Sequence, residues 1–520
     1  MSKDLSHKNK FTDQPISYWI ATTSDTDYPK VENDLDVDVA IIGGGITGLT
    51  TAYLLKSSGI RVAVIDSNRI IKGVSGHTTA KITSQHSLKY SKMINAVGEE
   101  KAQQYAFANQ AAIDLISNII EDKNIDCDFL RTPAYVFTQD DTYVKKIEDE
   151  TNAAIKLKLP AEYVEKLDLP FAIKGAMKFS DQAQFHPRKY LLALASAIEG
   201  EDCHIFENTR VVDIEEGEPH IVVTDSGKKI RADSVVQATR YPFYDKPGLY
   251  FTRLYPERAY LLGMHINSSF PEGMYINAES PSRTLRLHTT DDDSLLLIGG
   301  ENHKTGHGAN LHQHYEIIRD YAQQYFDVID IPYRWSAQDY TSMDEIPIVG
   351  QMTSGKNKIY LATGFEKWGI SNGTAAAMII SDLILKEENP WEPVYNPSRF
   401  TPVASAKNFI VENADVAKNY VKGKLNIPEG TDHVEKGEAV ITEVDGYKLG
   451  MYKDMNGELH FVSTTCTHIG CELKWNSAEL SWDCPCHGSR FTYTGDIIEG
   501  PALECIKPIE AAGALGQDGE

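Results

Sequence analysis

The first strong hydrophobic pattern in the chain is a short apolar run that ends in three glycines. Val39-Ala40-Ile41-Ile42 leads into Gly43-Gly44-Gly45, and the segment from Ile46 to Leu55 follows. A second apolar run, Val62-Ala63-Val64-Ile65, comes next and ends at Asp66. Continuous apolar runs of this length are typical of strands that are buried on both faces. The pattern therefore predicts a strand, a glycine turn, a helix and a second strand.

Further along, the pattern predicts a long helix, a break and another helix. The apolar segment from Asn372 to Leu385 predicts a helix, and the segment from Lys386 to Pro393 is typical of a helix stop. Another helix is expected from about Ala404 to Lys424, because its apolar side chains fall on one stripe. We expect this helix to pack against the preceding part of the chain, and a simple spacer is the alternative.

The last part of the chain contains short runs rich in Val, Ile and Tyr. Two of them, Ala439–Val444 and Tyr447–Tyr452, predict small antiparallel strands. With 520 residues the chain is too long for one compact core, so we expect two or three domains. A hydrophobic content of 42% indicates an ordered globular protein.

The formal net charge of −23 narrows the choice of partners. Such a charge argues against binding to nucleic acid or to an anionic membrane surface by bulk electrostatics. The first residues lack an apolar signal core and a twin-arginine pair, and no apolar run has the length of a membrane span. We therefore expect a cytoplasmic protein without a transmembrane segment, with peripheral association with a membrane as the alternative.

The glycines of the first unit indicate a dinucleotide site. Gly43 permits a tight turn, Gly45 lets the backbone approach a pyrophosphate, and Gly48 permits close contact between helix and strand. The helix N-terminus adds positive potential for the phosphates, and Asp66 suits ribose hydroxyls. A glycine-rich turn without a ligand is the alternative. Only one such fingerprint is found, which disfavours NAD(P)H as the hydride donor.

The motifs after Asp66 decide which dinucleotide is expected. In order, they resemble those of FAD-dependent oxidoreductases of the glycine/D-amino-acid oxidase type. The matching segments are Gly73–Lys81, Asn208–Val212, Asp233–Thr239, Leu296–Gly300, Asp344–Gly350 and Ala362–Ile370. The resemblance implies an FAD cofactor, and it adds to the four residues above the cofactor-binding residues Ser75, Gly76, Val211, Gly364 and Gly369.

Two segments depart from the usual motifs of this family. The family commonly has glycine after Ala238-Thr239, where this chain has Arg240, a side chain that can alter the approach to the ligand or reach a phosphate. Residues 77–81 are also atypical, so the resemblance does not carry over a substrate. Covalent attachment of flavin to His77 is an alternative that nothing in the local sequence requires.

The resemblance also places several polar side chains near the flavin. Lys81 and Lys367 are expected near the ring, where a lysine can polarise N5 or bind a substrate carboxylate, and ordinary surface lysines are the alternative. Arg258, Tyr260 and Arg286 are expected on strands that roof the flavin, where an arginine can hold a carboxylate by two parallel hydrogen bonds. We predict catalytic roles for Lys81, Lys367, Arg258 and Tyr260.

Two boxes of cysteines and histidines lie near the C-terminus. The first is Cys466-Thr467-His468-Ile469-Gly470-Cys471, and the second is Cys484-Pro485-Cys486-His487-Gly488-Ser489. Two cysteines and two histidines can make a tetrahedral zinc site, and a stray disulfide pair is a further alternative. Neither alternative explains the glycines, which suit tight loops that approach a cluster, or Ser489, whose hydroxyl can hydrogen-bond a cluster sulfur.

These boxes and the segment Gly500-Pro501-Ala502 resemble Rieske [2Fe–2S] domains. The resemblance implies that Cys466 and Cys484 bind one iron, that His468 and His487 bind the other, and that Cys471 and Cys486 form a disulfide. Many such domains have a tyrosine where this chain has Phe491, and that tyrosine hydrogen-bonds a cysteine sulfur. We therefore expect a potential in the lower or middle part of the Rieske range.

The remaining cysteines and a group of histidines are given ordinary roles. Cys127, Cys203 and Cys505 are predicted to be buried apolar thiols. A mononuclear iron site is one interpretation of the histidine group, but the required spacing of an acid and two histidines is missing. We interpret these histidines as parts of a polar, solvated loop: His303, His307, His312 and His314.

Together these expectations divide the chain into three parts. Residues 1–390 are predicted to form an α/β Rossmann-like FAD-binding domain with an α+β substrate domain. The FAD-binding parts are about 37–100, 186–245 and 340–390, and the substrate parts are about 100–185 and 246–339. Residues 391–430 are expected to form a linker with a helix, and residues 431–510 a small all-β Rieske domain.

The expected function is that of an FAD-dependent oxidoreductase that acts as a dehydrogenase. A small amine or amino-acid-like donor gives a hydride to flavin, and electrons leave singly through the Rieske cluster to an external acceptor, a protein or a quinone. One alternative is an electron-transfer or redox-sensing protein without substrate turnover. Another is reverse flow, from the cluster to flavin.

Overall fold

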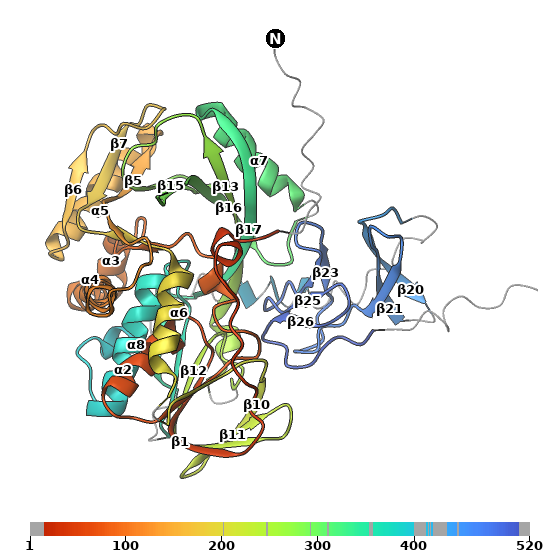
Figure 1. Ribbon diagram of the computed structural model, residues 1–520. Coiled ribbons are helices and arrows are strands. Elements are labelled where there is room, and N and C mark those ends of the chain that lie inside the picture. The colour runs from red at the N-terminus through yellow and green to blue at the C-terminus, as the bar shows by residue number, and fades with distance from the viewer. Residues whose placement is uncertain are drawn as a thin grey trace, which may run out of the picture.

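The chain folds into two large sheets with helices around them and a smaller C-terminal region of short strands (Figure 1). The computed structural model describes residues 15–200, 202–245, 248–291, 293–308, 311–352, 357–399, 412–413, 415–416, 418–419, 434–444 and 447–508. The first large sheet lies in the lower part of Figure 1, the second in the upper part, and the C-terminal strands at the right.

The first sheet grows from the predicted strand–turn–helix–strand unit. Its parallel centre is formed by β1, β2, β9 and β12, and the antiparallel pairs β10–β11 and β18–β19 extend it along one edge of β12. The strands are β1 (Leu35–Ile42), β2 (Val62–Ile65), β9 (His204–Phe206), β10 (Val211–Glu215), β11 (His220–Thr224), β12 (Lys229–Arg240), β18 (Ile348–Gln351) and β19 (Ile359–Thr363). Every residue of β2 is buried, as expected for a strand covered on both faces.

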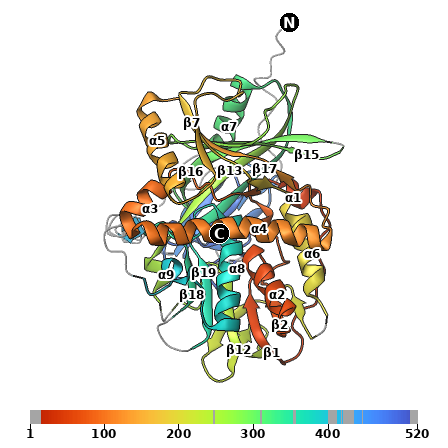
Figure 2. The ribbon, with the colours of Figure 1, turned by 90° about the vertical axis from the view of Figure 1, so that its left-hand side faces the viewer.

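Helices cover the first sheet and separate it from the second. The helix that follows the glycine turn packs against the long helix after β19 and against the helix before β9. These and neighbouring helices are α1 (Tyr18–Ala21), α2 (Ile46–Ser57), α3 (Tyr90–Val97), α4 (Glu99–Lys123), α6 (Pro187–Ile198), α8 (Gly369–Lys386) and α9 (Glu392–Tyr395). In the view of Figure 2, α4 crosses the middle of the molecule between the two sheets, and it also contacts α8.

The second sheet is mostly antiparallel and has the strand order β17-β13-β16-β15-β14-β5-β7-β6. Its strands and helices are β5 (Ala134–Thr138), α5 (Asp141–Lys156), β6 (Ala161–Val164), β7 (Gly175–Phe179), β13 (Leu254–Ile266), β14 (Met274–Asn277), β15 (Arg283–Thr289), β16 (Ser294–Lys304), α7 (His312–Tyr325) and β17 (Val328–Ser342). Three short strands, β3 (Lys81–Ile82), β4 (Leu130–Arg131) and β8 (Ala183–Gln184), form a separate sheet. Two single turns of 3-10 helix complete this part, Val74–Gly76 and Tyr250–Thr252.

Alternate residues of β13 point to opposite faces of the second sheet. Tyr260 and Leu262 pack with α7 on one face, whereas Leu261 belongs to the large core that includes α2, α4 and α8. This alternation follows from strand geometry, in which successive side chains point to opposite sides. The strand therefore presents one set of residues to the interior of the molecule and another to its far side.

The C-terminal region is all-β. One sheet contains β20 (Ala439–Val444), β21 (Tyr447–Lys453) and β22 (Leu459–Ser463), and another contains β23 (Lys474–Asn476), β24 (Ser481–Asp483), β25 (Arg490–Thr492) and β26 (Ile497–Glu499). Trp482, Phe491 and Leu473 are completely buried in its small core, together with the cysteines of both boxes. This is the predicted pattern of short antiparallel strands.

Six residues of the predicted linker helix are described, and all six are helical: 412, 413, 415, 416, 418 and 419. Lys304, at the end of β16, donates hydrogen bonds to Glu412 and Asp415, each at 2.6 Å. Val416 packs against the core of the C-terminal region. The described residues of this helix therefore contact both neighbouring parts of the chain, and the rest of the predicted helix lies outside the described residues.

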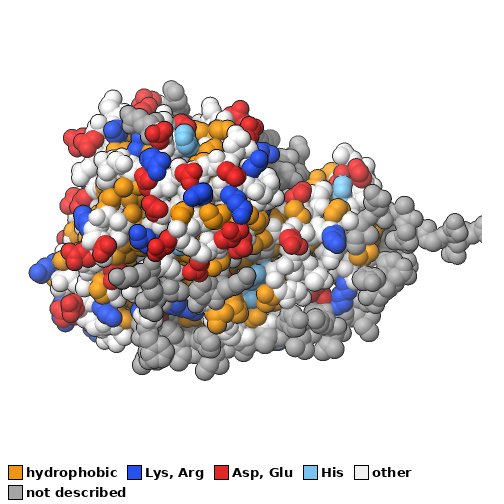
Figure 3. Space-filling model, turned by 90° about the horizontal axis from the view of Figure 1, so that it is seen from below, with side chains coloured by type: hydrophobic (Ala, Val, Ile, Leu, Met, Phe, Trp, Pro, Cys, Tyr) orange, Lys and Arg blue, Asp and Glu red, His pale blue; other side chains and the backbone are white. Residues whose placement is uncertain are grey.

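The surface carries charges of both signs. On the face seen from below, Lys and Arg side chains are interspersed among Asp and Glu side chains (Figure 3). Within the described ranges of the chain, no helix has the length and apolar character needed to cross a bilayer.

Candidate functional site

A cavity of about 1110 Å³ runs between the first sheet, the second sheet and the C-terminal region. At one end it is lined by the glycine turn after β1 and by Asp66 at the end of β2. It is also lined by the segment 73–81 except Gly76 and Ala80, by the N-terminus of α8, and by Glu257, Ala259 and Leu261 of β13. Residues 497–503 of the C-terminal region close another part of its wall.

The glycine turn has the shape that a pyrophosphate requires. Gly43 has φ +109°, and a Cβ at this position would lie 2.5 Å from the carbonyl oxygen of Ala238. A Cβ on Gly48 would lie 1.9 Å from the carbonyl oxygen of Gly43. Asp66 accepts a hydrogen bond from the N–H of Gly44 at 2.8 Å, which ties the turn to the end of β2. The turn therefore leaves its backbone close to the cavity and directs the N-terminus of α2 toward it.

The predicted cofactor-binding residues fall into two groups. Gly43, Gly45, Asp66, Ser75, Val211 and Gly369 line the cavity. Gly48, Gly76 and Gly364 are not among the lining residues. Gly48 and Gly76 instead allow close packing of the backbone, since a Cβ on Gly76 would lie 2.4 Å from the carbonyl oxygen of Ile71, and Gly364 has φ +75°. The first group, together with the size of the cavity, fits an FAD molecule.

Lys81 is a buried cation in the wall of the cavity. Its ammonium donates a hydrogen bond to the carbonyl oxygen of Tyr275 at 3.0 Å. Burial, with Arg286 nearby, lowers the pKa of Lys81 from 10.5 to about 7. Arg286 donates from Nε to the carbonyl oxygen of Thr79, and its guanidinium lies 5.3 Å from the ring centroid of Trp19. Its Nη1 and Nη2 atoms have no hydrogen-bond partner among the described residues. The two side chains are buried cations, and no carboxylate of the described residues is among the groups that shift their pKa values.

Lys367 lines the cavity at the turn before α8. Its ammonium lies 3.0 Å from a carboxylate oxygen of Glu257, and its backbone N–H donates to the carboxylate of Asp339 at 2.5 Å. Lys367 has φ +70°, a left-handed conformation that the hydrogen bond to Asp339 helps to hold. The lysine is therefore placed beside the cavity, with its charge already paired.

Arg258 and Tyr260 lie on β13, but their side chains are on the face opposite the cavity-lining residues Glu257, Ala259 and Leu261. Arg258 donates to the hydroxyl of Ser336 and lies 3.7 Å from Glu479 of the C-terminal region. Tyr260 packs against α7. Successive side chains of a strand point to opposite faces of the sheet, so a prediction that is wrong by one position in the sequence places the side chain on the wrong face. We therefore do not include these two residues in the proposed site.

The two Cys/His boxes form facing loops. Cys466 and Cys484 are buried free thiols that hydrogen-bond each other, which lowers the pKa of Cys466 to about 7. The rings of His468 and His487 lie 5.1 Å apart, centroid to centroid. Both Nδ1 atoms are buried and have no hydrogen-bond partner among the described residues. Two thiols and two unpartnered imidazole nitrogens are the donor set of a Rieske [2Fe–2S] cluster, so these residues fit that group.

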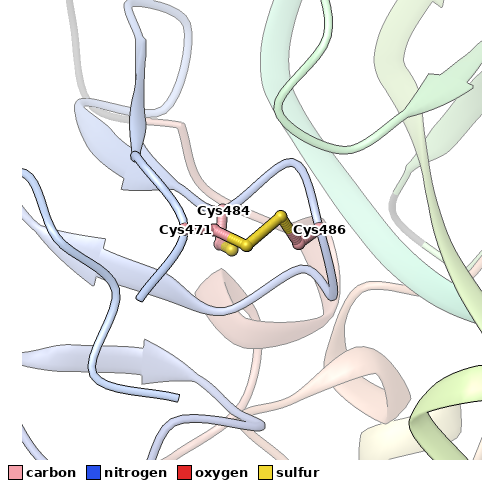
Figure 4. Close-up of side chains that lie close together, drawn as sticks. All are labelled: Cys471, Cys484 and Cys486. Atoms are coloured by element: carbon pink, nitrogen blue, oxygen red, sulfur yellow. A yellow bond between two sulfur atoms is a disulfide. The ribbon is translucent and has the colours of Figure 1, made fainter. Parts of the chain in front are cut away.

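Figure 4 shows how the other two cysteines of the boxes lie beside Cys484. Cys471 and Cys486 form a disulfide, as the resemblance to Rieske domains implied. The sulfur atoms of Cys471, Cys484 and Cys486 lie within 4.8 Å of one another. Since two of the three are joined in the disulfide, Cys484 is the thiol of this group that can bind iron.

Hydrogen bonds surround the Cys466 sulfur. The backbone N–H groups of His468 and Ile469 and the hydroxyl of Ser489 are its partners, besides Cys484. The same Ser489 hydroxyl accepts a hydrogen bond from the N–H of Ala502 at 3.0 Å, which ties the Gly500–Ala502 loop to the cluster site. Phe491 is completely buried in the same core and has no hydroxyl to offer.

The C-terminal region also contributes to the cavity, which the sequence did not predict. Its lining residues are Glu479, Arg490, Thr492, Asp496, Ile497, Ile498, Glu499, Gly500, Pro501, Ala502 and Leu503. Asp339 and Ser336 of β17 also line the cavity without having been predicted. Apart from Gly500-Pro501-Ala502, which resembles a segment of Rieske domains, no motif marks these positions, because their role in the cavity depends on how two distant parts of the chain meet.

The cysteines outside the two boxes and the histidine group differ in part from the predictions. Cys127 and Cys203 are buried as predicted, but the prediction for Cys505 is wrong, because this thiol is exposed. The interpretation of the histidine group as a solvated loop is also wrong for three members, because His303 lies on β16 and His312 and His314 lie on α7. His303 and His314 are partly buried and stack on each other, with ring centroids 4.7 Å apart.

Comparison with known proteins agrees with this geometry. Residues 38–383 match the family described as FAD dependent oxidoreductase, and residues 429–510 match the Rieske [2Fe-2S] domain. The chain is 41% identical over 497 residues to the putative Rieske 2Fe-2S iron-sulfur protein YhfW of Bacillus subtilis, covering 95% of this chain and 98% of the relative.

More distant matches concern the first two sheets. Gamma-glutamylputrescine oxidoreductase of Escherichia coli is 22% identical over 400 residues, which cover 72% of this chain and 89% of that protein. The structure of glycine oxidase from Geobacillus kaustophilus superposes with a TM-score of 0.57 at 18% identity, covering 70% of this chain and 99% of that one. The second likeness concerns the fold.

Substitution of Gly48 by alanine should abolish FAD binding. The added Cβ would lie 1.9 Å from the backbone carbonyl oxygen of Gly43, so the turn must shift away from its present shape. We expect purified G48A protein to lack the flavin absorbance while it retains the cluster absorbance. Ser57→Ala is the control, because Ser57 lies on the same helix α2, is exposed and does not line the cavity. Normal flavin content in G48A would contradict this role.

Substitution of Lys81 by methionine should stabilise the protein in a pH-dependent way. Since the pKa of Lys81 is 10.5 in the unfolded reference and about 7 in the folded protein, the unfolded chain binds an extra proton between these values. The contribution of Lys81 to the free energy of unfolding therefore rises with pH across this window, by up to about 1.4 kcal/mol per pH unit. The lysine destabilises the fold most below pH 7.

The expected result is a thermal midpoint of K81M that exceeds that of the unsubstituted protein most at pH 6 to 7. The difference should shrink as the pH rises toward 10.5, where both states carry the charge less often. The exposed Lys166, substituted as K166M, serves as the control. A constant difference over the whole pH range would mean that Lys81 keeps an ordinary pKa.

Substitution of Phe491 by tyrosine should raise the reduction potential of the cluster. A hydroxyl that reaches a cluster sulfur stabilises the reduced, more negative state. One hydrogen bond of about 0.5–1.5 kcal/mol corresponds to roughly 20–65 mV for a one-electron couple. A redox titration followed by the EPR signal of the cluster measures the shift, and F107Y, at an exposed position of α4, is the control. An unchanged or lower potential in F491Y would contradict the argument.

Proposed function

Because the chain belongs to the FAD dependent oxidoreductase family and carries a Rieske [2Fe–2S] domain, we propose that it oxidises an amino-acid-like amine donor. Electrons then pass singly through the cluster to an external acceptor. The observation that carries this proposal is the shared cavity, whose wall contains both the glycine turn and residues 497–503 beside the cluster. When bound, FAD takes up a hydride from the donor, and a Rieske cluster carries one electron at a time.

The charges at the inner wall of the cavity support a donor with a carboxylate. Lys81 faces the cavity, and Arg286 stands next to it with two unpartnered nitrogen atoms. An anionic group of the donor would compensate this pair of buried cations, which otherwise costs free energy. A carboxylate bound there would restore the charge of Lys81 and fix the position of the rest of the donor.

The names of two relatives support a donor with an amino group. Gamma-glutamylputrescine and glycine each carry an amine together with a carboxylate, and the proteins named for them share the first two sheets with this chain. The acidic residue Asp496 of the wall lies in the part contributed by the Rieske domain. It can attract a cationic amine, while Lys81 holds the acid end of the donor.

The contact between the cavity wall and the cluster loops supports transfer within the chain. Tyr340 follows Asp339 on β17, and its hydroxyl donates to the carbonyl oxygen of the cluster ligand His487 at 2.9 Å. Asp339 lines the cavity and accepts the N–H of Lys367. Neighbouring residues of one strand thus contact the flavin side and the cluster side, so no external carrier is needed between the two groups.

An anaerobic screen tests the proposal. The purified holoprotein is mixed with glycine, L-proline, D- and L-amino acids, N-methylated amino acids and γ-glutamyl amines, and with hydroxy acids for comparison. We expect at least one amino compound to bleach the flavin absorbance and then to produce the EPR signal of the reduced cluster. Bleaching by hydroxy acids alone, or by none of the compounds, would rule out an amine dehydrogenase.

The K81M variant then tests how the donor is held. Loss of one charged hydrogen bond should raise the half-saturating concentration of the active donor by roughly 10–100-fold. K166M should leave this concentration unchanged. An unaltered half-saturating concentration in K81M would show that Lys81 does not bind the donor, and it would leave the outcome of the screen unaffected.

A further inference from the structure

The Rieske domain lies against one face of the neighbouring strands β13 and β17. Tyr340 donates to the carbonyl oxygen of His487, and Gln338 donates from Nε2 to the carbonyl oxygen of Gly488 at 2.8 Å. Asp339 lies between Gln338 and Tyr340 in sequence, and it pairs with Glu257 on β13. These two residues face the cavity instead. The two strands therefore stand between the cavity-lining residues Glu257 and Asp339 and the cluster loop that contains His487 and Gly488.

The approach of the two domains is too close for side chains at two glycines. A Cβ on Gly488 would lie 2.7 Å from Pro256 and 2.8 Å from Nε2 of Gln338. A Cβ on Gly306, in the loop after β16, would lie 2.6 Å from the backbone of Pro485. His487 is only 3% exposed as a result of this packing. The imidazole edge of the cluster site is thus covered by the first domain.

Buried charges join the domains beside this contact. Arg240, at the end of β12, lies 3.3 Å from Glu499, and Arg258 lies 3.7 Å from Glu479. Arg490 of the Rieske domain lies within 4 Å of both acids, at 3.6 Å from Glu499 and 3.8 Å from Glu479. Charges that are taken out of water persist only if they stay paired, so separation of the domains would leave several of them without a partner.

Arg240 stands out because its backbone is held in a conformation that L residues seldom adopt. Its φ is +66°, at a position where related flavoproteins commonly have glycine. The side chain donates from Nη1 to the carbonyl oxygen of Gln338 at 2.8 Å, and the guanidinium lies 5.7 Å from the ring centroid of Tyr340. One residue therefore contacts the Rieske domain and also both residues of β17 that bind the cluster loop. Such a departure is retained where the side chain has a task.

We propose that Arg240 is the positioning residue that keeps the Rieske domain docked on β13 and β17, and so fixes the distance between the flavin cavity and the cluster. Glu499 is its partner on the Rieske domain. The described residues of the linker helix assist from another side, because Lys304 binds Glu412 and Asp415 while Val416 contacts the Rieske core. That the fixed distance serves electron transfer from flavin to the cluster rests on the proposed function, whereas the docking of the Rieske domain does not.

Hydrogen exchange of the holoprotein tests the docking without any donor. Arg240→Gly removes the side chain and also relieves the left-handed backbone, so it is expected to fold. Loss of a buried charged contact should raise the opening equilibrium of the interface, and with it the exchange rate in peptides covering 484–490 and 497–503, by roughly tenfold. Arg240→Lys, which keeps the charge, should restore part of the protection.

A double-mutant cycle identifies the partner. If Arg240 acts through Glu499, the effect of R240G/E499Q on the exchange rate should be smaller than the product of the two single effects, because both substitutions remove the contact between these two residues. Arg231→Ala is the matched control, since Arg231 lies on the same strand β12 and pairs with Asp36 at the surface. If the effect of R240G/E499Q on the exchange rate equals the product of the two single effects, Glu499 is not the partner of Arg240.

Flavin content separates this proposal from a role of Arg240 in binding the cofactor, because Arg240 also lines the cavity. The proposal requires that R240G retain FAD while the cluster loops exchange faster. Loss of FAD with unchanged exchange in the cluster loops would overturn it, and so would unchanged exchange with full FAD content. Neither result bears on whether an amine reduces the flavin, which the anaerobic screen decides separately.

Discussion

The alternation of side chains along β13 and β17 is the constraint on which the rest of the site depends. Because successive residues of a strand point to opposite faces, the same two strands can line a cavity with Glu257, Ala259 and Asp339 and hold a second domain with Gln338 and Tyr340. In a helix these two sets of residues could not be separated so cleanly. A two-stranded wall places two redox groups close together while it keeps their chemistry apart.

The wall is completed by charges that are costly when isolated. Arg240, Arg258 and Arg490 are matched by Glu479, Glu499 and Asp483, all deeply or largely buried. Removal of one partner from such a set typically costs about 3–5 kcal/mol, because it leaves an uncompensated charge in a dry environment. Lys81 and Arg286 are the opposite case. They lie buried beside the cavity without an acid among the described residues, so their burial is a burden that a ligand can relieve.

The sequence predicted the parts of this protein whose chemistry is local. Gly43, Gly45 and Asp66 follow one another within a single strand–turn–helix unit, and the Cys/His boxes carry their own loop geometry, so both sites could be identified by spacing. The sequence could not show which face of β13 meets the cavity, and the candidates Arg258 and Tyr260 lie on the other one. The predictions for Cys505 and for the stacked histidines His303 and His314 were wrong for a related reason, because the exposure of a side chain depends on which distant segment covers it. Arg240 was visible as a departure from glycine, but its partner Glu499 lies more than 250 residues away and was not.

Residues Ile497–Leu503 form part of the wall of a cavity whose glycine turn begins at Gly43. A ribosome makes these two parts of the chain at very different times, and N-terminal domains generally fold first. The dinucleotide site can therefore take shape while it is still open on the side that the Rieske domain later covers. The flavin has a route of entry during synthesis that the finished wall narrows, and the order of the domains along the chain becomes an order of assembly.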